Sequence, residues 1–372
     1  MPNVLLVGAF GQGNPGDEAL CAAFLQALSV DDVVVASRDP AATTAQHRVR
    51  AVSDQPLTVA RELCRCDAVV VGGGTVFKTL RPSTGRRATA LLQNACALTA
   101  AAKAAGKHVA MVGVGAGDLR GRQPRLLVRW LIRHADLLVL RDEESAAALT
   151  EIGSPTPFWI GADPAWSLRG RRPDVSGDAA ECRRSVTVAL SHHAGDDRLF
   201  ANLAAAIASL DASHEVRLQP WQTGPGGDVE IAERLAERLG GDVKILDPPT
   251  DLDAAITTFA DDRLVVALRF HALVAAGQAG TRSIAISHEP KLAGLSRRLR
   301  QVSVPVDGTA EVLAAALRRA IDGDPPSDAD VGREVAASHH TMQLLRLLLD
   351  GGDLDEPSLL VGLPQSSGGG TW

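Results

Sequence analysis

Two residues whose side chains can bind anions or transfer protons follow an apolar run in "LVVALRFHALVAAGQAG", residues 264–280. Arg269 carries a planar guanidinium, which holds a carboxylate or a phosphate through two parallel hydrogen bonds. His271 carries an imidazole, the side chain whose charge changes nearest to neutral pH, as a general acid or base requires. The pair therefore indicates binding of an anion together with transfer of a proton.

The elements on either side of this pair would place it where ligands bind. The run before Arg269 is typical of a buried parallel strand, and the Ala/Gly-rich stretch after it is typical of a helix. Ligands of α/β proteins lie at the carboxyl ends of strands and near helix N-termini. Residues two apart in extended backbone point the same way, so we expect Arg269 and His271 to face the ligand and Phe270 to pack inward. The alternative is an inter-domain ion pair at Arg269 and a core-capping His271.

The same alternation of short apolar runs with helical patterns extends along the chain. Strands are predicted at 3–8, 32–36, 67–71, 108–114, 136–141, 185–190, 214–219, 243–246, 263–268 and 282–287. Strands that alternate with helices form parallel, doubly wound sheets. The sequence therefore predicts an α/β fold of two Rossmann-like domains, GT-B-like, with the active site in the inter-domain cleft.

A polar stretch at 167–185 interrupts the alternation and marks the boundary between domains. The predicted segments are a first Rossmann-like domain at 1–170, a linker at 171–185, a second Rossmann-like domain at 186–325, a C-terminal helix at 326–351 and a flexible tail at 352–372.

Composition narrows the class of protein. The formal net charge of -6 argues against a nucleic-acid binder, whose surface would be basic. The N-terminus lacks the pattern of a signal peptide, and no apolar run reaches the ~20 residues that span a bilayer. Five cysteines, an odd number, favour a reducing compartment, and the lone Cys64-x-Cys66 lacks a second pair of metal ligands. We expect a cytoplasmic protein without a metal or cofactor. The sequence leaves open whether the protein forms a homo-oligomer.

Glycine-rich loops follow three strands of the first domain. The first, "GAFGQGNPGDEAL" (8–20), matches neither the dinucleotide fingerprint nor the P-loop. Its Gly13 and Asn14 are candidate substrate contacts. Asp17 and Glu18 would stand at a helix N-terminus, where they either favour the helix dipole or orient the hydroxyls of a sugar. The other loops contain Gly73, Gly74 and Gly115, and they indicate close approach to a ligand or tight packing.

An ordered set of motifs resembles the polysaccharide pyruvyl transferase family. They are "GNPGDEAL", "VGGGTVF", "VGVGAGDL", "LRDEESAAAL", "GADPAWSL", "LRFHALVAAGQAG" and "IAISHEPKLAGL". The resemblance implies a GT-B-like fold and transfer of pyruvate from phosphoenolpyruvate, as co-substrate, onto two hydroxyls of one sugar as a cyclic ketal. The acceptor would be a cell-envelope glycan or a lipid- or nucleotide-linked precursor. The first domain would hold this acceptor and the second the phosphoenolpyruvate.

The resemblance also suggests roles for single residues. The family's Arg-x-His motif, linked to phosphoenolpyruvate binding and proton transfer, matches Arg269 and His271. Lys291 is then a second phosphate contact, and Asp17 or Glu18 accepts protons from the sugar hydroxyls. Where relatives tend to have Ser-Tyr-Asp-x-Lys this chain has Ser-His-Glu-Pro-Lys, which makes His288 a candidate contact and leaves the acceptor less defined than the donor.

Four further positions are weaker candidates. His192 follows a predicted strand at its carboxyl end, where it either lines the site or lies on the surface. Arg217 lies inside a strand and serves either the site or the fold. Arg141 ends a strand as a candidate anion contact, next to Asp142, which is expected to cap a helix. Asp163 is expected to cap the turn before Pro164.

Two other functions compete with pyruvyl transfer. A GT-B glycosyltransferase would need an acidic residue for the donor ribose after a glycine-rich loop, and "PWQTGPGGDVE" (220–230) offers Asp228 or Glu230. A non-catalytic protein that senses a sugar or a phosphate is the third reading. Binding of a nucleotide without phosphoenolpyruvate favours the glycosyltransferase, and binding of neither favours the sensor.

Overall fold

The chain divides into two compact units in its computed structural model. The first comprises Met1–Gln12, Leu20–Leu168 and Glu334–Trp372, and the second comprises Gly13–Ala19 and Arg169–Arg333. The structure describes residues 2–80, 85–153, 158–168, 184–192, 197–211, 213–223, 227–241, 243–352 and 354. The predicted linker at 171–185 lies outside these residues apart from 184 and 185, and the predicted tail at 352–372 lies outside them apart from 352 and 354.

A parallel sheet forms the centre of the first unit. Its strands are β1 (Val4–Val7), β2 (Val33–Ser37), β3 (Arg50–Ser53), β4 (Ala68–Gly72), β5 (Thr75–Phe77), β6 (His108–Ala116), β7 (Leu137–Leu140) and β8 (Trp159–Ile160). They are ordered β3-β2-β1-β4-β6-β7-β8, and β5 pairs with the end of β6. The order reverses between β1 and β4, so the first and second of the predicted glycine-rich loops, which follow β1 and β4, leave neighbouring strand ends.

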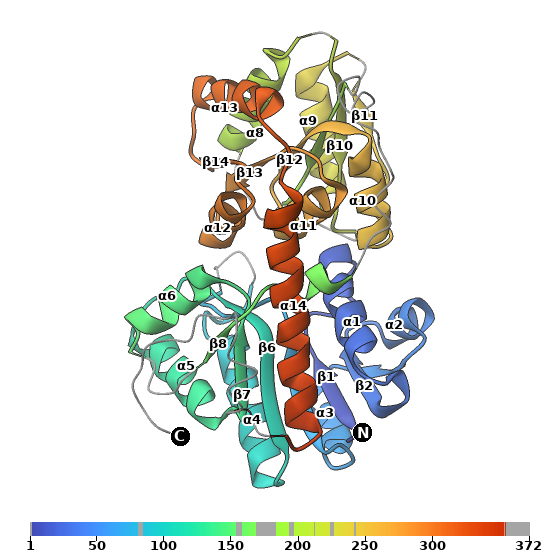
Figure 1. The fold of residues 1–372 in the computed structure, drawn as a ribbon, viewed down its shortest axis with the longest axis vertical. Coiled ribbons are helices and arrows are strands. Elements are labelled where there is room, and N and C mark those ends of the chain that lie inside the picture. The colour runs from blue at the N-terminus through green and yellow to red at the C-terminus, as the bar shows by residue number, and fades with distance from the viewer. Residues whose placement is uncertain are drawn as a thin grey trace. The chain divides into compact units, whose positions relative to one another are not determined.

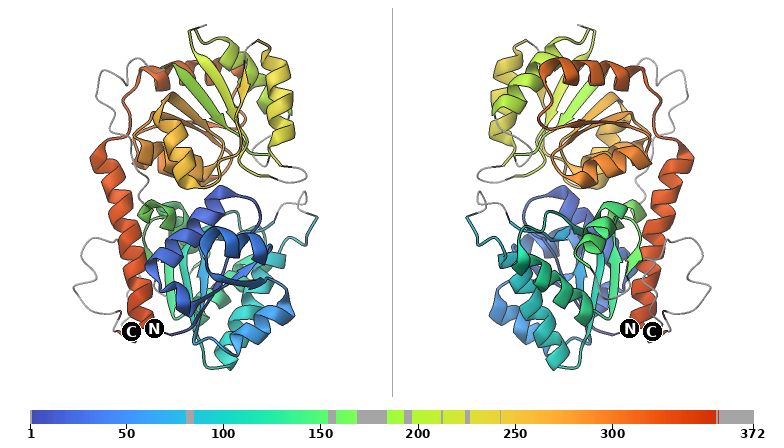
Figure 2. Two further views of the ribbon diagram at one scale, coloured as in Figure 1. Left: turned by 90° about the vertical axis from the view of Figure 1, so that its right-hand side faces the viewer. Right: turned by 90° about the vertical axis from the view of Figure 1, so that its left-hand side faces the viewer.

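Helices cover both faces of this sheet (Figure 2). They are α1 (Pro15–Ala27), α2 (Pro40–His47), α3 (Pro56–Leu63), α4 (Ala90–Ala104), α5 (Arg122–His134) and α6 (Glu143–Glu151), with 3-10 turns at Val30–Asp32 and Pro164–Ser167. The core on one face joins strand residues such as Val69, Met111 and Leu138 to Leu92 of α4 and Leu131 of α5. The N-terminal turn of α1 belongs to the second unit, because residues 13–19 pack there.

The long helix α14 (Asp328–Leu349) returns to the first unit along most of its length (Figure 1). Ser338 donates its hydroxyl hydrogen bond to the Pro164 carbonyl, and Arg346 donates to the Ala27 carbonyl. Thr341 Oγ1 accepts a hydrogen bond from Ala162 N. These contacts hold α14 against residues of the first unit that are far from it in the sequence.

The second unit repeats the same plan with a parallel sheet of its own. Its strands are β9 (Ser185–Ala189), β10 (Glu215–Gln219), β11 (Lys244–Ile245), β12 (Asp262–Ala267), β13 (Ser283–Ser287) and β14 (Val302–Pro305), ordered β11-β10-β9-β12-β13-β14. Its helices are α8 (Asp197–Ala208), α9 (Val229–Leu239), α10 (Leu252–Ala260), α11 (Phe270–Ala279), α12 (Pro290–Arg298) and α13 (Ala310–Asp322). The order reverses between β9 and β12, and loops at such a reversal leave room for a ligand.

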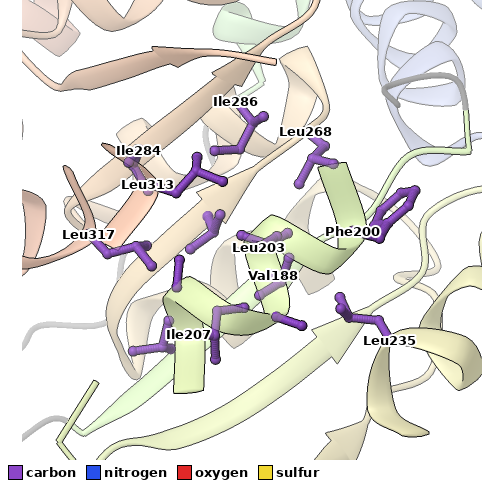
Figure 3. Close-up of a cluster of buried hydrophobic side chains, with 14 of the residues drawn as sticks. Val188, Phe200, Leu203, Ile207, Leu235, Leu268, Ile284, Ile286, Leu313 and Leu317 are labelled. Atoms are coloured by element: carbon purple, nitrogen blue, oxygen red, sulfur yellow. The ribbon is translucent and has the colours of Figure 1, made fainter. Parts of the chain in front are cut away.

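Alternating side chains of these strands build the core of the second unit. Val188, Leu268, Ile284 and Ile286 project toward α8 and α13, where they meet side chains such as Leu203 (Figure 3). Val265 and Ala267 are equally buried and belong to the opposite face of β12. Burial on both faces explains why the strand reads as a continuous apolar run.

The structure confirms each of the ten predicted strands and adds four short ones, β3, β5, β8 and β14. All four lie at a sheet edge or outside the main strand order. Asp142 and Asp163 cap the elements after them, as predicted, by accepting hydrogen bonds from Ser145 N and Ala165 N.

Candidate functional site

The reversal of strand order in the second unit brings two predicted site residues to neighbouring strand ends. Arg269 follows β12, and His192 follows β9. The two strands remain paired to their ends, because Leu268 N donates to the Ala189 carbonyl over 3.0 Å. Arg269 and His192 therefore share the carboxyl edge of the sheet, where α/β proteins bind ligands.

Arg269 is the N-terminal cap residue of α11, with extended backbone (φ −123°, ψ 141°). Its Nε donates to the Leu190 carbonyl over 2.8 Å, and Nε and Nη2 donate to Asp228 Oδ2 over 3.0 and 2.6 Å. Only 10% of the side chain is exposed. Among the described residues the structure records no partner for Nη1, which carries two N–H groups able to donate hydrogen bonds.

Asp228 is the buried carboxylate that holds this guanidinium. It also accepts hydrogen bonds from His192, through both the backbone N and Nδ1, and from Trp221 N and Gln222 N. Burial alone would raise the pKa of Asp228. The hydrogen bond from His192, the charge of Arg269 and the backbone donors outweigh burial, and the pKa lies well below its usual value. Asp228 is therefore ionised throughout the neutral range.

His271 is placed differently from the sequence prediction. The helix begins at Phe270, so His271 is its second residue and not part of an extended segment. The expectation that Arg269 and His271 share a direction through a two-residue repeat is wrong, because α11 starts one residue after Arg269. Phe270 is buried, as predicted, and its ring meets the His271 imidazole edge-on at 5.5 Å between centroids.

The start of α1 packs against His271 within the second unit. A Cβ built on Gly16 would lie 2.2 Å from His271 Nδ1, so only glycine leaves room for the ring. Asn14 caps this helix start: its Oδ1 accepts from Gly16 N, and its carbonyl accepts from Asp17 N and Glu18 N. The loop residue before it is also anchored, because the Gly13 carbonyl accepts from Thr223 N over 3.2 Å.

Asp17 lies at this helix start, where side chains of the second unit act on its carboxyl group. Asn14 Nδ2 donates to Asp17 Oδ2 over 2.8 Å. Burial raises the pKa of Asp17, and the charges of His271, Arg269 and Lys291 oppose that rise without cancelling it. The structure thus brings together a carboxyl group that gains a proton more readily than usual, an imidazole and two cations.

The remaining predicted residues of this edge follow β13. Lys291 is in the first turn of α12, and its Nζ lies 2.6 Å from Glu289 Oε2. His288 is partly buried between β13 and α12. Glu18, next to Asp17, is 6% exposed. Lys291 acts on the Asp17 carboxyl electrostatically, so it belongs to the same group of charges.

Arg217 is not brought to this edge. Its side chain, 16% exposed, forms an ion pair with Asp262 at the amino end of β12, and its Nε donates to Thr187 Oγ1. Thr187 Oγ1 donates to the same Asp262 oxygen over 3.0 Å. Burial raises the pKa of Asp262 to about 7, although Arg217 and Thr187 both lower it. The contacts of Arg217 are those of a residue that serves the fold.

In the first unit, Arg141 follows β7 directly and is buried. Its Nε donates to Asp142 over 3.0 Å, its Nη2 donates to Thr75 Oγ1 over 2.9 Å, and its Nη1 lies 3.6 Å from Asp163. A Cβ on Gly115 would lie 2.7 Å from Arg141 Nη2. At Gly115, therefore, the missing side chain makes room for Arg141.

Gly73 and Gly74 adopt left-handed backbone, with φ of 66° and 71°. A Cβ on Gly73 would meet Leu20 at 2.6 Å, whereas the space beside Gly74 is open within 4 Å. Close packing therefore explains Gly73, and backbone conformation alone explains Gly74.

Two residues that the sequence did not assign to this group prove central to it. From the sequence, Gly16 was included only as one of several glycines in the loop 8–20. Asp228 was named only as a candidate ribose contact of a glycosyltransferase. Within the described part of the chain, no group of three or more His, Cys, Asp or Glu side chains is arranged to hold a metal ion. No helix there is long and apolar enough to cross a membrane.

Comparisons with known proteins give a family and a fold. The family model for polysaccharide pyruvyl transferase matches residues 14–290, well over half of the chain. No curated protein sequence matches this chain.

Similar solved structures include MnaA from S. aureus bound to UDP, with a TM-score of 0.64 and 12% identity over 94% of this chain and 97% of that one. HepE from Anabaena in complex with UDP-glucose has a TM-score of 0.63 and 15% identity, over 94% of this chain and 100% of that one. The UDP-GlcNAc 2-epimerase from Methanocaldococcus jannaschii has a TM-score of 0.60 and 11% identity, with coverage of 94% and 100%. At these identities the likeness shows the fold, and it confirms the predicted α/β, GT-B-like architecture.

Proposed function

Because the chain belongs to the polysaccharide pyruvyl transferase family, we propose that it transfers pyruvate from phosphoenolpyruvate onto two hydroxyls of one sugar. The product is a cyclic ketal on a cell-envelope polysaccharide or on its lipid- or nucleotide-linked precursor, and phosphate is released. A cytoplasmic location is part of this proposal. The observation that carries it is the group of Asp17, Arg269, His271 and Lys291, which combines anion-binding cations with groups that exchange protons.

The reaction places two demands on such a group. The first sugar hydroxyl adds to C2 of the enol, loses its proton, and C3 gains a proton to become a methyl group. The second hydroxyl then displaces phosphate from C2 and loses its proton to an acceptor, while the departing phosphate takes a proton from a donor. The protein must therefore hold a carboxylate and a phosphate, and it must move protons at two stages.

The residues divide between these demands. Arg269 Nη1 and Lys291 Nζ bind the phosphate or the carboxylate of the donor. His271 donates a proton to C3 or to the departing phosphate. Asp17, with Glu18 beside it, accepts protons from the sugar hydroxyls, and burial supports this because it raises the pKa of Asp17 and makes its carboxylate a stronger base.

A second function is favoured by one specific observation. MnaA and HepE have the same fold and carry UDP or UDP-glucose in their structures. This chain could therefore be a glycosyltransferase that uses a nucleotide sugar, or it could accept a nucleotide-linked sugar in the pyruvyl transfer. The family match favours pyruvyl transfer as the reaction.

Thermal unfolding with phosphoenolpyruvate, and separately with UDP-, GDP- and dTDP-sugars, tests the donor. A ligand at 100 times its dissociation constant stabilises the folded chain by about 2.7 kcal/mol, which raises the melting temperature measurably. We expect a shift with phosphoenolpyruvate that Arg269→Ala abolishes. Arg318→Ala, on the exposed face of α13, is the matched control and should keep the shift. A shift with a nucleotide sugar alone would identify a glycosyltransferase instead.

A further inference from the structure

We infer that Asp228 is a positioning residue that orients two functional side chains at once, Arg269 for binding of the donor anion and His192 for proton transfer. This inference rests on the proposed function and adds to it a second proton acceptor, His192. The side chain of Asp228 is completely buried, and each of its two oxygens receives a different set of donors.

The Oδ2 atom of Asp228 fixes the direction of Arg269. It accepts hydrogen bonds from Nε and Nη2, which lie on one edge of the guanidinium. The Leu190 carbonyl also accepts a hydrogen bond from Nε. A guanidinium is planar, so gripping one edge determines where the remaining nitrogen points. Nη1 is thereby presented in one orientation to an incoming anion.

The Oδ1 atom of Asp228 fixes the proton of His192. It accepts from the His192 backbone N over 2.8 Å and lies 2.7 Å from Nδ1. An ionised carboxylate can only accept hydrogen bonds, so Nδ1 must carry the proton. The neutral imidazole then has its lone pair on Nε2, which is the atom able to take a proton. The side chain is 21% exposed, so a substrate can reach it.

Three loops converge on this single carboxylate. His192 follows β9, Arg269 follows β12, and Trp221 N and Gln222 N, which follow β10, donate to Oδ2 over 3.0 and 2.9 Å. An asparagine amide would place an N–H group against donors at one of the two oxygens, so it could not receive all of them. The position needs a carboxylate.

The proposed chemistry gives this arrangement a purpose. Two hydroxyl protons must be removed, one in the addition to C2 and one in the displacement of phosphate. Asp17 provides one acceptor beside Arg269, and His192 Nε2 provides another whose orientation depends on the same Asp228 that orients Arg269. Donor binding and the second proton transfer are coupled through one buried carboxylate.

The test compares two isosteric substitutions at buried carboxylates of the same sheet. Asp228→Asn breaks the arrangement described here, and Asp262→Asn breaks the buried pair with Arg217 at the opposite end of β12. Both replace a buried carboxyl group that contacts an arginine, so loss of stability alone affects both. Well below both melting temperatures, we expect Asp228→Asn to lower kcat/KM for phosphoenolpyruvate at least 100-fold and Asp262→Asn less than threefold. Equal effects of the two would overturn the inference.

Histidine 15N NMR on the unaltered chain provides a readout that does not depend on a folded variant. His192, assigned by comparison with His192→Gln, should show its proton on Nδ1 at a pH where the ring is neutral. A proton on Nε2 would overturn the inference.

Titration with inorganic phosphate separates this inference from the proposed function. We expect Asp228→Asn to weaken phosphate binding at least tenfold and Asp262→Asn to leave it unchanged; equal binding by all three proteins would overturn the role of Asp228. If the unaltered protein consumes no phosphoenolpyruvate with any sugar, the proposed function fails, while the tautomer and the phosphate titration still decide the role of Asp228.

Discussion

Replacement of Gly16 by alanine would test whether the start of α1 sets the position of His271. The added Cβ would lie 2.2 Å from Nδ1, 2.6 Å from Cγ and 2.9 Å from Cβ of His271. Ordinary contact begins near 3.4 Å, so the ring or the helix start must move by about 1 Å. Gly16 is in the first turn of α1 without a left-handed φ, so the backbone itself accepts alanine.

The magnitude follows from that displacement. Overpacking a close contact lowers the free energy of unfolding by about 1–3 kcal/mol. A misplacement of about 1 Å in a catalytic group lowers turnover by about 100-fold, which corresponds to about 2.7 kcal/mol of transition-state stabilisation. Against this, Gly→Ala inside a helix ordinarily gains about 1 kcal/mol. Any loss in Gly16→Ala must therefore come from the contact with His271.

The assay is release of phosphate from phosphoenolpyruvate with an accepted sugar, together with urea unfolding. Gly332→Ala is the matched control, because Gly332 lies within α14 and a Cβ there meets nothing within 4 Å. The control should keep full turnover and gain up to about 1 kcal/mol of stability. If Gly16→Ala keeps kcat/KM within about twofold of the unaltered chain, the reasoning that ties His271 to α1 is refuted.

Three further substitutions test the electrostatics and packing around the two sheets. Because burial raises the pKa of Asp262 to about 7, the folded chain keeps a proton there that the unfolded chain releases near pH 4. The contribution of Asp262 to the free energy of unfolding should therefore fall, by at most about 4 kcal/mol, as the pH rises from 4 to 7. Urea unfolding of the unaltered chain and of Asp262→Asn across this range measures it. A constant difference in free energy of unfolding between the two proteins would contradict the prediction. Gly115→Ala should lower the free energy of unfolding by about 1–3 kcal/mol, since its Cβ would lie 2.7 Å from Arg141; an unchanged urea midpoint would contradict this. Arg269→Lys should raise the phosphate dissociation constant at least tenfold in calorimetry, because an ammonium cannot span Asp228 and an anion together; binding as tight as before would count against the fixed guanidinium edge.

Central strands were predictable because both of their faces are buried. In β12 every residue from Leu264 to Ala267 is fully buried, and such a run is unmistakable in the sequence. The edge strands β3 and β14 gave no such signal. Arg50 begins β3 exposed, and β14 alternates between buried Val304 and exposed neighbours before it ends at Pro305. Their pairing comes from the sheet beside them more than from their own residues.

The position of the Arg-x-His pair was predictable, but its conformation was not. A strand followed by an Ala-rich stretch located Arg269 at the carboxyl edge of the sheet, where the structure places it. The sequence did not reveal that helical hydrogen bonding begins immediately, with Leu273 N donating to the Arg269 carbonyl. The start of a helix is set within a residue or two by its cap, which a pattern of apolar residues does not resolve.

The role of Asp228 was not predictable from the sequence, because it depends on the order of the strands in the sheet. Its partners His192 and Arg269 are separated from it by 36 and 41 positions. They meet because β10, β9 and β12 are neighbours in the sheet although β11 intervenes in sequence. A carboxylate buried without partners would hold a proton; the donors at these three strand ends keep Asp228 ionised. The same contacts that make its burial tolerable also fix Arg269, so the guanidinium is oriented before the anion of the proposed function binds.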